Sequence, residues 1–116
     1  MTEKFFGSAT RVPLTGAQSF LAHYLPVTPL IEATGVASVP IHLKNETVLP
    51  TGSFKARGAL YDPSETLRRR HVSEVVASST GNHGAAVAWA AKVLGVAATI
   101  FLPTNPNVVK KKLMGA

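Results

Sequence analysis

Residues 74–102 read EVVASSTGNHGAAVAWAAKVLGVAATIFL, and this stretch decides the fold. Residues 74–77 are typical of a short strand, and residues 96–102 form the continuous apolar run of a buried parallel strand. Between them, residues 82–94 predict a helix that is apolar on nearly all sides, with Gly95 as its C-terminal stop. The stretch therefore predicts a βαβ unit of an open parallel sheet, with a right-handed crossover.

The segments around this unit predict one more strand and several helices. Residues 39–44 alternate as a half-buried strand, which we place near a sheet edge because Pro40 cannot donate to a ladder. Asp62, Pro63 and Glu65 have the pattern of a second helix start, so we expect a new helix to begin there, with Asp62 as its cap. Helices are expected over residues 15–25, over residues 54–61, and from Asn105 onward.

Composition excludes several classes of protein. The chain has 116 residues, a net charge of +6 and no cysteine. The lack of cysteine excludes a disulfide scaffold, a thiolate zinc site and a cysteine nucleophile. The two basic runs, Arg68–Arg70 and Lys110–Lys112, lack the aromatic residues that accompany single-strand binding, so we expect no nucleic-acid partner. His23 and His42 lack metal-ligand spacing with any neighbour, so no metal is expected.

Residues 84–102 are nearly apolar and long enough to raise the question of a membrane span. Lys92 near the middle would cost roughly 2.5–3.5 kcal/mol in a bilayer, and Gly95 divides the segment into two patterns. The first residues carry no long apolar stretch of the kind that a secretory signal needs. We therefore expect no membrane partner and a cytoplasmic location.

Lys55 is the first candidate for chemistry, within the segment PTGSFKARGA at residues 50–59. It stands in the first turn of its predicted helix, where the positive end of the helix dipole favours an uncharged amine. Arg57 and burial against Phe54 would act in the same direction. A neutral lysine amine is what Schiff-base chemistry requires. A surface lysine on a short helix is the alternative interpretation.

The segment SSTGNHG at residues 78–84 is the second candidate, because it joins a strand end to a helix start. Ligands bind at this position in open α/β sheets, and the exposed N–H groups of a helix start suit a carboxylate or a phosphate. A polar turn with a helix cap remains the alternative. The chain has no G-x-G-x-x-G pattern and no Walker loop, so the common nucleotide-binding motifs are absent.

Taken together, the two segments resemble the fold-type II pyridoxal-phosphate enzymes, the family of tryptophan synthase β. Thr28-Pro29-Leu30, then Leu43–Glu46, then residues 50–59 and 78–84 follow in the order and spacing of that family. The similarity is greatest to the serine/threonine dehydratases (threonine ammonia-lyase) and to serine racemase. Ala56 after the lysine also resembles the dehydratases. The resemblance implies an α/β fold, the N-terminal portion of such an enzyme, with helices on both faces of the sheet.

The resemblance also implies roles for individual residues. Lys55 is similar to the lysine that forms the Schiff base with pyridoxal 5′-phosphate, and Phe54 to the aromatic residue beside the cofactor ring. Asn82 resembles the residue that bonds to the ring hydroxyl oxygen. Thr80 departs from the family's shorter Ser-Ser-Gly-Asn-His pattern. The loop that grips the substrate carboxylate is represented here by Ser78, Ser79, Thr80, Gly81 and His83.

The implied activity is β-elimination, a deamination that converts L-threonine or L-serine to a 2-oxo acid and ammonia. A serine racemase, a threonine synthase-like enzyme, an inactive binding module and a small basic nucleic-acid-binding protein are the alternatives. In family terms, residues 1–61 begin the large cofactor-binding domain and residues 62–116 begin the small one. No three consecutive glycines for a phosphate-binding loop occur. We therefore expect a fragment, inactive by itself, of a lyase that forms a homo-oligomer.

Overall fold

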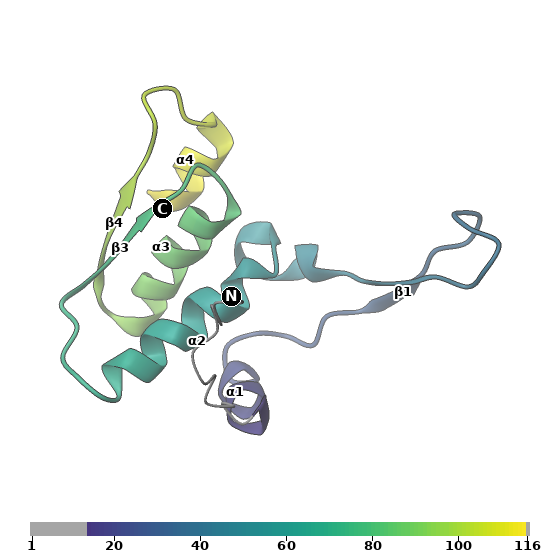
Figure 1. Cartoon of the computed structure of the whole chain (residues 1–116), viewed down its shortest axis with the longest axis horizontal. Coiled ribbons are helices and arrows are strands. Elements are labelled where there is room, and N and C mark those ends of the chain that lie inside the picture. The colour runs from purple at the N-terminus through teal and green to yellow at the C-terminus, as the bar shows by residue number, and fades with distance from the viewer. Residues whose placement is uncertain (1–13, 116) are drawn as a thin grey trace, which may run out of the picture.

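The computed structural model describes residues 14–115 of the chain. A small βαβ unit and a long helix form the body of the molecule, and a two-stranded arm projects from it (Figure 1). The elements in chain order are α1 (Leu14–Leu21), β1 (Leu30–Glu32), β2 (His42–Lys44), the 3₁₀ turns η1 (Glu46–Val48) and η2 (Pro50–Gly52), α2 (Lys55–Leu67), β3 (Glu74–Ser78), α3 (Asn82–Leu94), β4 (Ala97–Phe101) and α4 (Val108–Met114).

The predicted βαβ unit is confirmed. Strands β3 and β4 pair in parallel, with Val76 opposite Thr99, and α3 connects them. The helix ends where the sequence predicted, because Gly95 adopts a left-handed conformation with φ of 71° and its N–H bonds back to the last turn. The α/β fold class follows from this unit.

Helix α2 packs along α3 and closes the core between them. Leu60 is fully buried there against small side chains of α3, among them Ala86 and Ala90. Alanine at these positions lets the two helix backbones approach closely, so the interface depends on a few larger side chains. Phe20 of α1 extends this core, since its ring lies 5.9 Å from the ring of Tyr61.

The predicted start of a second helix at Asp62 is wrong, because α2 continues through Pro63 to Leu67. Proline removes one backbone donor from a helix interior, but burial of this helix against α3 outweighs that loss. The hydroxyl of Ser64 donates to the carbonyl of Tyr61 at 2.6 Å beside the proline. No boundary between helices falls at residue 62, and the division into two domains there stays a prediction.

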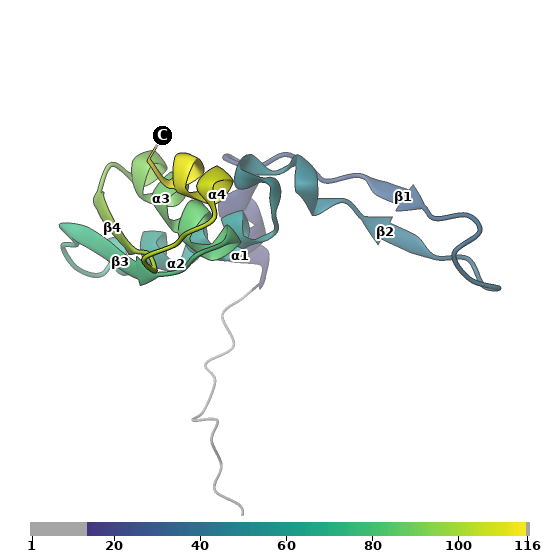
Figure 2. The ribbon, with the colours of Figure 1, turned by 90° about the horizontal axis from the view of Figure 1, so that it is seen from above.

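The predicted half-buried strand over residues 39–44 forms only as the short strand β2, and it is exposed. It pairs antiparallel with β1, a strand that the sequence analysis did not expect, and Leu43 remains 54% exposed. The hairpin of β1 and β2 projects away from the helices, as Figure 2 shows, so its apolar side chains reach no core. The alternation of apolar and polar residues correctly predicted a strand, but it could not show whether another element would cover its apolar face.

The prediction that residues 96–102 form a buried strand is also wrong in part, because the strand forms but is not buried. β4 lies largely exposed, and Phe101 is 61% accessible. A parallel strand is buried when helices cover both faces of its sheet. Within residues 14–115, α3 packs on one face of β3 and β4, and Val76 on the opposite face stays exposed. The helices expected on both faces are therefore seen on one face in this part of the chain.

Helix α1 is shorter than predicted, since it ends at Leu21 and turns follow to residue 25. Leu25 is nonetheless buried, and its N–H bonds to the carbonyl of Leu21 at 2.9 Å. None of the described helices is both long enough and apolar enough to cross a membrane.

Candidate active site

The loop before Lys55 holds an unusual backbone. Thr51 has φ of 68° and Gly52 has φ of 69°, so two successive residues adopt the left-handed conformation. For threonine, whose side chain branches at Cβ, this conformation costs on the order of 1–3 kcal/mol. The reversal leads through extended Ser53 to Phe54 and the start of α2. Backbone strain thus lies directly before the candidate lysine.

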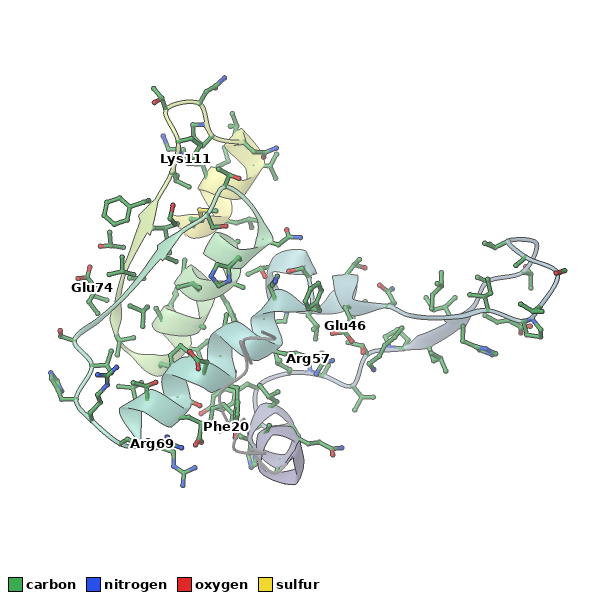
Figure 3. The ribbon with its side chains drawn as sticks, viewed as in Figure 1. Phe20, Glu46, Arg57, Arg69, Glu74 and Lys111 are labelled. Atoms are coloured by element: carbon green, nitrogen blue, oxygen red, sulfur yellow. The ribbon has the colours of Figure 1, made fainter. Side chains whose placement is uncertain are left out.

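A cluster of four side chains, here named the Glu46 cluster, joins this loop to the arm and to α2. Its members are Thr28, Lys44, Glu46 and Arg57. Arg57 grips the Glu46 carboxylate with two donors, Nε at 2.7 Å and Nη2 at 3.1 Å, and the Thr28 hydroxyl donates to the same carboxylate at 2.6 Å. Lys44 Nζ lies 3.8 Å from Glu46 and 3.4 Å from the Thr28 carbonyl oxygen. Figure 3 shows Glu46 and Arg57 together where the arm meets the body.

The electrostatics of the cluster follow from these contacts. Hydrogen bonds from Arg57 and Thr28, with the positive charges of Arg57 and Lys44, lower the pKa of Glu46 to about 2. The hydrogen bond to Glu46 raises the pKa of Arg57 in turn. Both groups are therefore charged at neutral pH, and the pair is a charge-assisted fork.

We expect the Glu46 cluster to make stability depend on acid. Because the folded pKa of Glu46 is about 2 against an ordinary 4.5, its contribution is complete above pH about 4.5 and is lost as the pH falls toward about 2. Solvent screening limits that contribution to about 1–2 kcal/mol, since the Glu46 and Arg57 side chains are 19% and 33% exposed. Urea unfolding of the parent chain and of Glu46→Gln measures it. The stability difference between the two should shrink from pH 6 to pH 2.5, and a constant difference would contradict the assignment.

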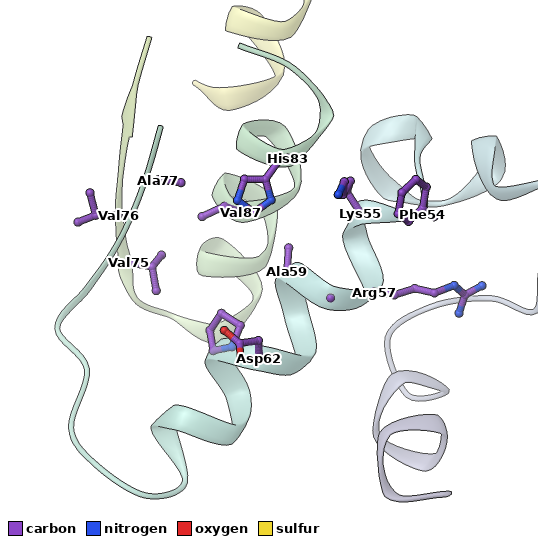
Figure 4. Close-up of a pocket in the computed structure, with 12 residues that line it drawn as sticks. Phe54, Lys55, Arg57, Ala59, Asp62, Val75, Val76, Ala77, His83 and Val87 are labelled. Carbon is purple, nitrogen blue, oxygen red and sulfur yellow. The ribbon is translucent and has the colours of Figure 1, made fainter. Parts of the chain in front are cut away.

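A cleft of about 610 Å³ opens between α2, β3 and α3. Phe54, Lys55 and His83 line it together, so the structure brings one predicted site residue of α3 to the same opening as the candidate lysine (Figure 4). Lys55 is exposed, and its Nζ lies 5.0 Å from the centre of the Phe54 ring. The far wall is apolar, formed by side chains that include Val75, Ala77 and Val87.

The other predicted site residues lie beside the cleft and not in its lining. Ser78 ends β3, Asn82 begins α3, and both are exposed. The Ser79 hydroxyl accepts a bond from the N–H of Gly81 at 3.2 Å, which shapes the turn between them. Thr80 is exposed in the same turn. The structure places this loop at one end of the cleft, and its contact with a substrate carboxylate stays a prediction.

Gly84 is explained by close packing and not by the approach of a ligand. A Cβ atom there would lie 2.8 Å from Met114 Cε, 3.0 Å from the Ser79 carbonyl oxygen and 3.1 Å from Ile100 Cγ2. Ala56 has a comparable explanation, since it is fully buried beside Leu25. The small side chain at position 56 is therefore explained by packing in the core, and it does not point to a particular substrate.

Gly84→Ala should destabilise the fold by about 1–3 kcal/mol, because the Ser79 carbonyl is backbone and cannot swing aside. Gly58→Ala is the matched control in α2, since no atom lies within 4 Å of a Cβ there. We expect it to stabilise the chain by about 0.5–1 kcal/mol through helix propensity. Chemical denaturation compares the two variants, and equal effects would contradict this account of Gly84.

Sequence reasoning missed the pairing of Glu46 with Arg57, although both residues lie in the segments that it used. The available signal was that Glu46 is the single acidic residue between Glu32 and Asp62. A lone acid in such a stretch, with lysines and an arginine nearby, is a candidate for a shared ion pair. Its partner could not be chosen among Lys44, Lys55 and Arg57 from spacing.

The residues present suit pyridoxal phosphate by their chemistry. A primary amine and an aromatic ring stand at the mouth of an apolar cleft large enough for a small heterocycle. The start of α3 has no side chain bonded to its first N–H groups, so donors remain there for an anion. Among residues 14–115, no group of three or more His, Asp or Glu side chains could hold a metal ion.

Comparison with known proteins agrees with this class of site. Residues 22–116 match the family described as pyridoxal-phosphate dependent enzyme. The chain belongs to this family, and its neighbours are enzymes of fold type II. The cofactor of the family is pyridoxal phosphate.

Individual relatives show which members of the family this chain is similar to. The human serine dehydratase-like protein is 43% identical over 93 residues, which are 77% of this chain and 28% of that protein. The mitochondrial threonine dehydratase of Schizosaccharomyces pombe is 35% identical over 100 residues, 86% of this chain and 17% of that protein. The structure of maize serine racemase matches with a TM-score of 0.80 at 32% identity, covering 88% of this chain and 32% of that one. The chain thus spans less than a third of each of these proteins and is most like the serine/threonine dehydratases.

Proposed function

We propose that this chain carries the lysine and the substrate loop of a pyridoxal-phosphate-dependent lyase that deaminates L-threonine or L-serine. The observation that carries the proposal is the position of Lys55, beside Phe54 and opposite His83, on one apolar cleft. Sequence identity to a serine dehydratase-like protein and to a threonine dehydratase supports the substrate class. The proposal includes a homo-oligomer, which the resemblance implies, and a cytoplasmic location, which the sequence analysis predicts.

In this proposal each side chain has a separate role. The Lys55 amine would be the covalent attachment point for the cofactor, and as a free amine it would take the α-proton of the substrate. Phe54 would lie beside the cofactor ring, and the Asn82 amide would donate to its hydroxyl oxygen. Bound pyridoxal phosphate supplies an electron sink that makes the α-proton acidic.

The loop after β3 binds the substrate carboxylate in the proposed reaction. Its hydroxyls and N–H groups, with His83 at the cleft, suit one carboxylate held at a helix start. The β-hydroxyl leaves as water. The imine released from the enzyme then takes up one water, so the net products are a 2-oxo acid and ammonia. The substrate-loop residues are Ser78, Ser79, Thr80, Gly81 and His83.

The test supplies L-threonine and L-serine with pyridoxal phosphate to an enzyme that carries this chain as its N-terminal portion, and it measures ammonia, 2-oxo acid and D-serine. Ammonia and 2-oxo acid in equal amounts support the lyase. D-serine without ammonia would favour a racemase, the second candidate, which the similarity to maize serine racemase supports. If neither product exceeds the level of a Lys55→Ala variant of that enzyme, the proposed activity is refuted.

A further inference from the structure

The helix that carries Lys55 begins without the groups that ordinarily stabilise a helix start. Its N-cap residue is Phe54, which makes no side-chain cap bond, and its first turn has no acidic residue. The turn holds two cations instead, Lys55 and Arg57, at the positive end of the helix dipole. An isolated helix start of this composition would fray, so another part of the chain must hold it.

Glu46 supplies the missing negative charge from outside the helix. Its carboxylate accepts both Arg57 donors and the hydroxyl of Thr28, a residue only 4% exposed. The pair is therefore fixed from two sides, by a buried residue before β1 and by the first turn of α2. A planar guanidinium held by two donors has little freedom to rotate.

The direction of Arg57 has a consequence for its neighbour. In Figure 4 the Arg57 guanidinium is directed away from His83 and from the Lys55 amine. Arg57 follows Lys55 by two residues in the same turn and also contributes to the lining of the cleft. A guanidinium that is held by Glu46 on the side away from Lys55 therefore restrains the turn that presents Lys55 to the cleft. The carboxylate that holds Arg57 does not itself line the cleft.

We propose that Glu46 is a positioning residue for Lys55, acting through Arg57. The inference rests on the proposed function of Lys55 and deepens it. Glu46 touches neither the cleft nor a reacting atom in this scheme. It holds the first turn of α2 in register, so that the amine meets an aldehyde in one orientation.

The test compares Glu46→Gln with Glu65→Gln in the full chain. Glu65 is the matched control, because it also forms ion pairs on α2, with Arg68 at 3.0 Å and Arg69 at 3.8 Å, but at the far end of the helix. Two readouts are taken. The first is amide hydrogen exchange of residues 55–58 without cofactor. The second is the ratio of borohydride-fixed pyridoxal phosphate on Lys55 to that on exposed Lys92.

We expect Glu46→Gln to speed exchange in the first turn and to lower the labelling ratio, each by about tenfold, the effect of losing one charge-assisted bond. Glu65→Gln should change neither by more than about twofold. Arg57→Lys should act like Glu46→Gln because it loses the fork, and adding Glu46→Gln to it should cause little further loss.

Two results would overturn the inference. One is an unchanged first turn and labelling ratio in Glu46→Gln. The other is faster exchange along all of α2 alike, which would show only a loss of overall stability. A parent chain that shows no preference for Lys55 would instead refute the proposed function, and the exchange data would still decide whether Glu46 holds the turn.

Discussion

In an enzyme that carries this chain as its N-terminal portion, replacing Lys55 by alanine is expected to abolish the covalent attachment of pyridoxal phosphate and to lower ammonia release by roughly 10³-fold or more. The same amine is proposed to hold the cofactor and to take the α-proton, so one substitution removes both. The expected loss is in kcat, because the substrate loop at the start of α3 is untouched. Absorbance of the attached cofactor and steady-state kinetics with L-threonine measure the two effects.

Lys92→Ala is the control for this experiment. Lys92 is an exposed lysine in the last turn of α3, at the opposite end of that helix from the substrate loop. It should retain attachment and turnover within about twofold. If Lys55→Ala kept a normal absorbance spectrum and normal rate, the assigned attachment site would be wrong.

Leu60→Ala is expected to destabilise the fold by about 2–5 kcal/mol, the largest stability effect in the chain. Leu60 is completely buried and is the large side chain at the centre of the α2–α3 interface. The alanines that face it have side chains too short to fill the space that Leu60 would leave. A cavity would therefore remain beneath the cleft that Lys55 lines.

Leu43→Ala separates this effect from a general loss of apolar surface. Leu43 lies in β2 and is 54% exposed on the projecting arm, so its truncation should cost less than about 0.5 kcal/mol. Urea midpoints with unchanged slopes give both values. A larger effect at Leu43 than at Leu60 would mean that the arm, and not the interface of α2 and α3, holds the structure together.

The parts of the fold that could be predicted are those that depend on residues close together in the sequence. The strand at residues 74–77, the helix to Leu94 and its end at Gly95 follow from apolar runs and one glycine, and all three are present. The continuity of α2 through Pro63 was not predictable, because its contact with α3, far along the chain, outweighs the local signal. The prediction that β2 and β4 are buried failed for the same reason. A pattern of apolar residues in a strand cannot show which other parts of the chain will cover it.

The candidate site divides in a similar way. Lys55 and His83 were singled out from their motifs, and the structure brings both to one cleft. The bond between Glu46 and Arg57 crosses from the arm to α2, and spacing alone cannot assign such a partner. Sequence therefore singled out the candidate reacting group, whereas the proposed support of that group became visible only in three dimensions.

The most direct test of the central claim is to map the lysine that holds pyridoxal phosphate. The chain is incubated with the cofactor and reduced with borohydride, and its peptides are then sequenced by mass spectrometry. We expect the modification to be confined to Lys55. Modification spread over Lys92 and the run Lys110–Lys112, with no excess at Lys55, would contradict the account.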